Sequence, residues 1–440
     1  MQNVLDPSDQ SMFDFGRASG VTTLLQGVWV YNHPIDVNGL RRFYGQLQRG
    51  RLSRRVEPSP LPFGRHRWVS ANGSAGLEIV PSARPREEFD VWLNEQANIS
   101  LDPESGPVWH LAMVPFTDGG AGVSLLIPHC VTDALGLFEG LADAALGRDD
   151  PIRWPAAASR RPAQALRQDA RQTIRDIPAF GRGVATAVRM VRRSRNSAGA
   201  ATPSPPTPTE PANGTHEPIA LPITTVFVDA DEWEARAQSL GGTSNTLLAA
   251  LAAHLAERRG RVTADGMVAL RIPVNQRVPG DTRGNATSPA DITVDPAPLT
   301  TDLRHIRATI KQALINHRQV PHEERDLMSL VPLLPKRFVK MIGGNGASVV
   351  STHMGVINPA ATRVDGTDAD YFAMRMYYPG MTEAMMHQFR GLQIVGSGRA
   401  NGQIFVAATA YRPGGTNSND ELRHDLSSAL KDFSLTGTPL

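Results

Sequence analysis

The sequence predicts an α/β protein of two halves joined by a flexible linker, and three observations lead to this fold class. First, 440 residues are more than one hydrophobic core usually serves, so two domains or subdomains are expected. Second, strand-like and helix-like segments alternate in both halves. Third, residues 196–218 are rich in Pro, Ser, Thr, Gly and Ala and cannot bury enough apolar surface to become ordered. We therefore expect an N-terminal subdomain over 1–158, a basic helical segment and flexible linker over 159–218, and a C-terminal subdomain over 219–440.

The N-terminal half contains both patterns. Strands are expected over 24–31, 108–116 and 122–128, where apolar and β-branched residues run together. Helices are expected over 36–48 and 134–146, because apolar residues recur there at the spacing of one helical face.

The C-terminal half repeats this alternation. Strands are predicted over 223–228, 267–275 and 404–411. Helices are predicted over 231–240, from Thr243 or Ser244 onward, and from about Asn419 to Leu430.

Residues 160–195 form a basic amphipathic segment that we expect to be broken at Pro178. Its positive charges are all arginines, and this basic segment allows three interpretations. The first is a solvated helix face. The second is peripheral contact with anionic lipid, and the third is docking of an acidic carrier protein.

Composition excludes several classes of protein. The net charge is only +2, so the chain is not expected to bind nucleic acid. The first fifteen residues are polar and acidic, unlike a signal peptide, and no apolar run approaches the roughly 18–20 residues of a membrane span. The single cysteine, Cys130, excludes a disulfide framework and a Cys-based zinc site. We expect a cytoplasmic, metal-free protein, with peripheral contact to a membrane through 160–195 left open.

The strongest chemical signal is His129 followed at a spacing of four by Asp133. His129 ends an apolar strand and Asp133 opens a helix, which places an imidazole at the end of a strand, where active sites of α/β layers gather. A neutral imidazole is a suitable base for a hydroxyl or an amine near pH 7. The structural alternative is a satisfied core histidine followed by a simple N-cap. The same spacing recurs at His322 and Asp326, but in a charged stretch that we interpret as a solvated helix start.

The segment around His129 resembles the His-His-x-x-x-Asp-Gly signature of the chloramphenicol-acetyltransferase-like superfamily. Nonribosomal-peptide condensation domains, wax ester synthase/diacylglycerol acyltransferases and mycobacterial polyketide-associated acyltransferases share this signature. The resemblance implies that His129 is the general base and that Asp133 mainly holds the loop by pairing with an arginine. Gly106-Pro-Val-Trp109 upstream is similar to the family's Gly-Pro-Leu-Trp strand.

A second resemblance lies in the C-terminal half. Pro273-Val-Asn-Gln-Arg277, followed by Gly284-Asn285, is similar to the Pro-Val-x-x-Arg … Gly-Asn signature of the wax ester synthase branch. It makes Arg277 the candidate partner of Asp133 and Asn285 a supporting residue. The structural alternative for Arg277 is a surface arginine after a strand.

The resemblance also implies architecture and activity. It predicts two acetyltransferase-like subdomains, each a mixed, largely antiparallel sheet covered by helices, with an active-site tunnel between them. The activity would be transfer of an acyl group to the alcohol of a lipid or polyketide, or to an amine. The donor would be a thioester, acyl-CoA or acyl-phosphopantetheine on an acyl carrier protein, and no metal or permanently bound cofactor is expected. A stand-alone condensation enzyme and a non-catalytic binding protein that retains the fold are the alternatives.

Some residues depart from the family pattern or stay outside it. Pro128 replaces the first His, and Ala134 replaces the Gly after Asp133. Cys130 is not expected to be a nucleophile. Gly396-Ser-Gly398 lacks the third glycine of a dinucleotide fingerprint and is interpreted as a turn before a strand. Five methionines between residues 374 and 386 either pack in the core or line an acyl tunnel.

Overall fold

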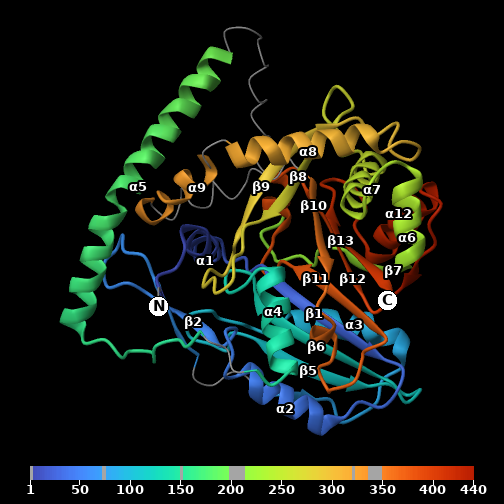
Figure 1. Cartoon of the computed structure of the whole chain (residues 1–440), viewed down its shortest axis with the longest axis horizontal. Helices are drawn as coiled ribbons and strands as arrows, with labels where there is room; N and C mark the ends of the chain where they lie inside the picture. Colours follow the sequence, from blue (N-terminus) through green and yellow to red (C-terminus); the bar gives the residue numbers. More distant parts are fainter. Residues whose placement is uncertain (1–2, 72–75, 149–151, 198–213, 320–322, 335–348) are drawn as a thin grey trace.

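The computed structural model describes residues 3–71, 76–148, 152–197, 214–319, 323–334 and 349–440. Its strands form two large sheets and a small ribbon, and helices cover the sheets (Figure 1). This is the fold class that the sequence predicted.

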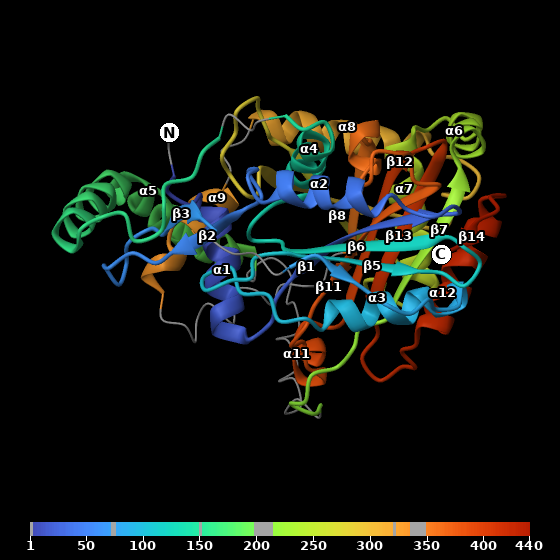
Figure 2. The ribbon, with the colours of Figure 1, turned by 90° about the horizontal axis from the view of Figure 1, so that it is seen from below.

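The first sheet has the strand order β11-β1-β6-β5-β4. Side chains alternate across it: Trp29 and Tyr31 join the core under α2 and α4, whereas Val28 and Val30 join a second cluster under α3. Figure 2 shows α2 and α4 on one side of these strands and α3 on the other. The bounds are β1 Leu24–Tyr31, β4 Glu78–Ile79, β5 His110–Pro115, β6 Ala121–Pro128, β11 Tyr371–Tyr377, α2 Val37–Leu47, α3 Phe89–Ala97 and α4 Ala134–Ala145, with a 3₁₀ turn at Arg86–Glu88 before α3.

One strand of the first sheet comes from the far end of the sequence. β11 lies within the range predicted as the C-terminal subdomain, but it pairs antiparallel with β1, from Leu24 opposite Tyr377 to Val30 opposite Tyr371. The two halves therefore share a sheet, and the end of β11 lies next to the start of β1.

The second sheet has the strand order β14-β7-β13-β12-β10-β8-β9. Helix α7, rich in Ala and Leu, packs on it together with α6, α8 and α12 in one core. The bounds are β7 Ile223–Asp229, β8 Val268–Asn275, β9 Thr287–Val294, β10 Val349–Val356, β12 Leu392–Ala400, β13 Gln403–Tyr411, β14 Thr438–Pro439, α6 Ala230–Ser239, α7 Ser244–Arg258, α8 Arg304–Gln319 and α12 Asn419–Asp432.

The remaining elements lie around the two sheets. Helix α1 packs beside the small ribbon of β2 and β3, and α5 runs along the outside of the molecule next to α9 (Figure 1). Their bounds are α1 Pro7–Ser19, β2 Arg54–Glu57, β3 Arg67–Ser70, α5 Pro162–Ser197, α9 Glu323–Met328 and α11 Glu383–Gln388, with 3₁₀ turns at Val331–Leu333 and Pro359–Thr362.

Two local predictions are wrong. Helix α5 continues through Pro178; the carbonyl that the proline cannot bond belongs to Ile174, which is exposed, so water can satisfy it. Gly396 and Gly398 lie inside β12 rather than in a turn. A Cβ on Gly398 would come within 2.8 Å of the Phe405 ring, so close packing explains the glycine.

Parts of the other predictions lie outside the described residues. Most of the predicted linker, residues 198–213, is among them, and so is His322 of the second His-Asp pair. Within the described part of the chain, no helix is both long and apolar enough to cross a membrane.

Candidate active site

His129 follows the last residue of β6, and its main chain is held from both sides. Its N–H donates to the Thr23 carbonyl at 2.8 Å, just before β1 begins. Its carbonyl accepts from Asn285 Nδ2 at 2.9 Å, from the other half of the chain. The position of His129 is therefore fixed through its backbone, by one residue from each half.

Asp133 is the N-cap of α4, and its carboxylate accepts from three donors. Gly136 N lies 2.7 Å and Arg277 Nη2 2.8 Å from Oδ1, and Ala286 N lies 2.8 Å from Oδ2. The Asp133 N–H also donates to the Gly284 carbonyl at 2.8 Å. Because both oxygens are occupied, this carboxylate suits a role in holding the loop rather than in moving a proton.

Arg277 lies in the loop between β8 and β9, residues 276–286, which we call the β8–β9 loop. The side chains of Arg277 and Asp133 are each only 5% exposed. Arg277 also donates to the carbonyls of Gly284 at 2.9 Å and Arg283 at 3.3 Å. The structure thus brings Arg277 to Asp133, and it fastens the β8–β9 loop to the loop that carries His129.

Gly136 makes this approach of Arg277 feasible. A Cβ on Gly136 would lie 2.8 Å from Thr132 Oγ1 and 2.9 Å from Arg277 Nη2. Ala134, where the family pattern has glycine, is only partly buried at the start of α4. The position that requires glycine for close packing in this chain is therefore 136.

Two residues of this network, Asp9 of α1 and Arg54 of β2, were not found from the sequence. Asp9 accepts from the main-chain N–H groups of Gly284 and Asn285 at 2.8 and 2.7 Å. Arg54 donates to the carbonyls of Val131 at 2.5 Å and of Thr282 at 2.6 Å. Both are buried, and no local pattern could have found them, because Asp9 lies in a polar segment and Arg54 in an arginine-rich one.

Burial shifts the pKa values of these groups. It raises the pKa of Asp9 to about 6, an effect that the charge of Arg54 opposes. It lowers the pKa of Arg54 to about 10, against the opposing effect of Asp9. The rings of Trp68 and Trp154 lie 4.1 and 4.8 Å from the Arg54 guanidinium and further support the cation.

The environment of His129 favours the neutral form of its imidazole at physiological pH. Burial lowers its pKa below 6.5; its own main-chain carbonyl, the charge of Asp133 and the Asn285 amide oppose this shift. A neutral imidazole at physiological pH can accept a proton, which a general base requires.

Cys130, the next residue, has the opposite character. Burial raises the pKa of its thiol to about 12, with a further contribution from Asp9. The thiol is therefore protonated at neutral pH and is a poor nucleophile.

A cavity of about 340 Å³ adjoins the His129 loop, and we call it the α1 cavity. Pro128 and Cys130, on either side of His129, both line it. Its other walls come from α1, the segment before β1 and residues 100–103: Met12, Phe13, Phe15, Gly16, Arg17, Gly20, Val21, Thr22, Thr23, Ser100, Leu101, Asp102 and Pro103.

The methionines between residues 374 and 386 divide between two apolar clusters. Met374 and Met376 join the core under the first sheet. Met381, Met385 and Met386 join a smaller cluster beside α11. Core packing accounts for all of them.

Comparison with solved structures identifies the architecture. The first condensation domain of the calcium-dependent antibiotic synthetase, in complex with a substrate analogue, superposes with a TM-score of 0.59 at 15% identity, over 99% of this chain and 96% of that one. The starter condensation domain of rhizomide synthetase gives 0.54 at 12% identity, over 98% and 93%. The chain has the condensation-domain fold.

Another solved structure shares this fold. Polyketide synthase associated protein 5 from Mycobacterium tuberculosis gives a TM-score of 0.51 at 15% identity, over 97% of each chain. No family model matches the sequence, and no curated protein matches it significantly. Identities this low establish the condensation-domain fold and leave the chemistry to be argued from the site.

Proposed function

We propose that this chain is an acyltransferase that moves an acyl group from a thioester to an alcohol acceptor, with His129 as the general base. The observation that carries the proposal is the placement of His129. It ends a buried strand, its backbone is fixed by Thr23 and Asn285, its pKa is lowered, and its neighbours Pro128 and Cys130 line the α1 cavity. The condensation-domain fold supports the same class of reaction.

The proposed reaction needs one base and no covalent intermediate. The imidazole of His129 accepts the proton of the acceptor hydroxyl while the oxygen attacks the thioester carbonyl carbon. The tetrahedral intermediate collapses, the carbon–sulfur bond breaks, and the leaving thiolate takes the proton from the imidazolium. The products are an ester and a free thiol. Asp133 and Arg277 act as positioning residues that hold the His129 loop.

The chemistry of the α1 cavity favours a substrate with an apolar part. Met12, Phe15 and Val21 present apolar side chains on one wall. The charged residues of this cavity lie at Arg17, whose guanidinium pairs with Asp102 at 3.5 Å and with Glu104. An alcohol on a lipid or polyketide chain fits such a site, because its body is apolar and its reacting group is polar.

The donor in this proposal is a co-substrate, acyl-CoA or acyl-phosphopantetheine on an acyl carrier protein. No metal ion or permanently bound cofactor takes part. The solved structures that share the fold include a condensation domain of a synthetase and a polyketide synthase associated protein, and in such assembly systems carrier-bound donors are a natural alternative to free acyl-CoA.

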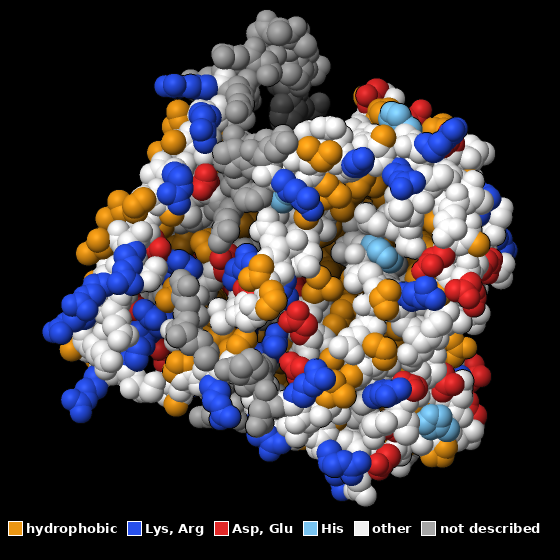
Figure 3. Space-filling model, in the orientation of Figure 1, with side chains coloured by type: hydrophobic (Ala, Val, Ile, Leu, Met, Phe, Trp, Pro, Cys, Tyr) orange, Lys and Arg blue, Asp and Glu red, His pale blue; other side chains and the backbone are white. Residues whose placement is uncertain are grey.

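Helix α5 supports peripheral contact with an anionic membrane. Leu166, Ile174, Ile177, Val184 and Val188 are 44–64% exposed. At about 100° per residue these five side chains fall within an arc of roughly 80°. Exposed arginines occupy the adjoining arc, and Figure 3 shows apolar and basic side chains along the edge that α5 forms. Such a helix is suited to lie in a membrane interface.

Two other functions remain as candidates. A stand-alone condensation enzyme that forms an amide or ester from carrier-bound substrates is favoured by the likeness to condensation domains. A non-catalytic binding protein would retain the fold without turnover, and Pro128 and Ala134, the departures from the family signature, favour it.

Thiol release from a panel of acyl-CoAs of increasing chain length, and from an acyl group on the phosphopantetheine of a carrier protein, tests the proposal, with alcohols and amines as acceptors. We expect acceptor-dependent release by the wild type and its loss in His129→Ala. His305→Ala, which removes an exposed histidine on α8, is the matched control and should retain activity. Release only with a carrier-bound donor and an amine would favour the condensation enzyme. No release with either kind of donor would favour the binding protein.

A further inference from the structure

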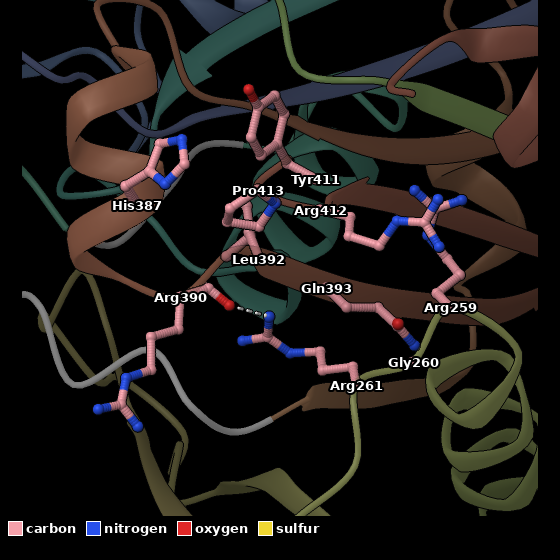
Figure 4. A pocket seen from close by; sticks show the side chains of 10 residues that line it. All are labelled: Arg259, Gly260, Arg261, His387, Arg390, Leu392, Gln393, Tyr411, Arg412 and Pro413. Carbon is pink, nitrogen blue, oxygen red and sulfur yellow. Dashed lines mark hydrogen bonds between the residues drawn. The ribbon is translucent and has the colours of Figure 1, made fainter. Parts of the chain in front are cut away.

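Four arginines line a pocket of about 330 Å³ that the proposed chemistry does not use. It lies in the C-terminal half, where α7 ends and where β12 begins beside the end of β13. We call it the arginine pocket (Figure 4). Its walls are Arg259, Gly260, Arg261, His387, Arg390, Leu392, Gln393, Tyr411, Arg412 and Pro413.

The guanidinium groups are held at different depths. Arg259 is 5% exposed; its Nη1 donates to Asp425 at 2.5 Å, while its buried Nη2 has no hydrogen-bond partner among the described residues. Arg261 donates to the main-chain carbonyls of Arg390 at 2.7 Å and Gly391 at 3.3 Å, the first of which is drawn in Figure 4.

The other two arginines are exposed. Arg390 forms no ion pair with the described part of the chain. Arg412 has a loose pair with Glu421 at 3.8 Å and is 44% exposed. His387 also lies on the wall, 4.0 Å from Glu383. Arg390 and the loosely paired Arg412 thus leave exposed positive charge at this pocket, which favours the binding of an anion.

We propose that the arginine pocket binds a phosphate monoester. A guanidinium presents a planar fork of donors that matches phosphate oxygens, and the exposed Arg390 and Arg412 can present this fork to a ligand. Leu392, Tyr411 and Pro413 add an apolar wall on which the body of a nucleotide can rest. A phosphorylated nucleotide therefore fits better than phosphate alone.

One source of such a group is the phosphorylated adenosine of coenzyme A, and this assignment of source rests on the proposed function. Leu392 and Tyr411 of the arginine pocket pack against an apolar cluster that also includes Phe15 and Val21. Phe15 and Val21 line the α1 cavity. One small apolar cluster thus borders both cavities.

Isothermal titration calorimetry of the full chain, in buffer without phosphate, tests the proposal with four probes. These are coenzyme A, dephospho-coenzyme A, adenosine 3′,5′-bisphosphate and inorganic phosphate. We expect the bisphosphate and coenzyme A to bind. Arg390→Ala combined with Arg412→Ala should weaken their binding at least tenfold, because both side chains are exposed and can be removed without disturbing a core. Arg42→Ala combined with Arg304→Ala, whose side chains are 70% and 80% exposed elsewhere, should leave binding unchanged.

The probes also distinguish the sources. Much weaker binding of dephospho-coenzyme A would identify the nucleotide phosphate as the recognised group, and equal binding of inorganic phosphate would identify free phosphate as sufficient. Equal affinities of the wild type and the Arg390/Arg412 variant, or no binding of any phosphate monoester, would overturn the proposal. Binding of the same probes to His129→Ala tests the arginine pocket independently of turnover. The arginine pocket can bind a phosphate monoester even if the proposed acyl transfer does not take place.

Discussion

Replacing Gly136 by alanine tests whether Arg277 and Asp133 are packed as tightly as the structure indicates. Gly136 lies in the first turn of α4, where alanine is ordinarily the better residue. An added Cβ, however, would lie 2.8 Å from Thr132 Oγ1 and 2.9 Å from Arg277 Nη2. Such distances are shorter than normal contacts, so Arg277 or α4 would have to move.

The expected magnitude follows from two opposing effects. Alanine in place of glycine favours a helix by about 1 kcal/mol. Crowding a packed site costs about 1–3 kcal/mol, and Arg277 cannot move away freely because it also bonds the carbonyls of Gly284 and Arg283. If the ion pair with Asp133 broke, the loss would approach the roughly 3–5 kcal/mol of a severed buried pair. We expect Gly136→Ala to be destabilised by up to about 2 kcal/mol, the balance of the first two effects.

The matched control is Gly45→Ala in α2. Nothing lies within 4 Å of a Cβ placed on Gly45, so this variant should gain up to about 1 kcal/mol from helix propensity alone. Urea unfolding followed by circular dichroism compares the two variants, and thiol release compares their turnover. If Gly136→Ala proved as stable as Gly45→Ala and fully active, the argument that Gly136 admits Arg277 to the site would be refuted.

Three further predictions concern pH and the membrane. The acid limb of kcat/KM should lie below pH 6.5, because burial lowers the pKa of His129 and the base must be unprotonated; a limb above 6.5 would contradict its assignment. Burial raises the pKa of Asp9 from 3.8 to about 6, so folding favours its protonated form, and its contribution to stability is lost as the pH rises through about 6. The free energy of unfolding of Asp9→Asn, measured relative to the wild type by urea unfolding, should therefore rise by about 1 kcal/mol between pH 5 and pH 7.5. A difference that stays constant over this range would disprove the pKa shift. The double variant Ile177→Glu/Val184→Glu should reduce co-sedimentation with anionic vesicles several-fold, whereas Val356→Glu, at an exposed residue of β10, should not. Equal binding by the wild type and both variants would show that α5 does not contact the membrane.

Local patterns in the sequence were sufficient for the elements next to the site. The apolar run of β6 and the helical spacing of α4 predicted both elements, and hence an imidazole between a strand and a helix. These predictions work because periodicity records which side of an element is buried. The role of Arg277 required the family resemblance, because an arginine after a strand has no local feature that distinguishes it from a surface residue.

The residues that were missed depend on contacts between distant parts of the chain. Asp9 accepts from residues 275 and more positions away, and burial of an acid in a polar N-terminal segment has no local sequence signal. The crossing strand β11 was missed for a related reason. Its methionines indicated only burial, and strand pairing across more than 340 residues, as between Val30 and Tyr371, cannot be inferred from periodicity.

The buried charges explain why the site is built from both halves of the chain. Asp9, Arg54, Asp133 and Arg277 bring two carboxylates and two guanidinium groups together, and each makes hydrogen bonds to the main chain of the His129 loop, of α4 or of the β8–β9 loop. None of them needs to touch the imidazole. Through these bonds they fix the β8–β9 loop, which presents the Asn285 amide to the carbonyl of His129. Arg277 and Asp133 are the ion pair of this group, so removing either one would leave the other charge buried without its partner, and the base would then lose its position without any change in its own side chain.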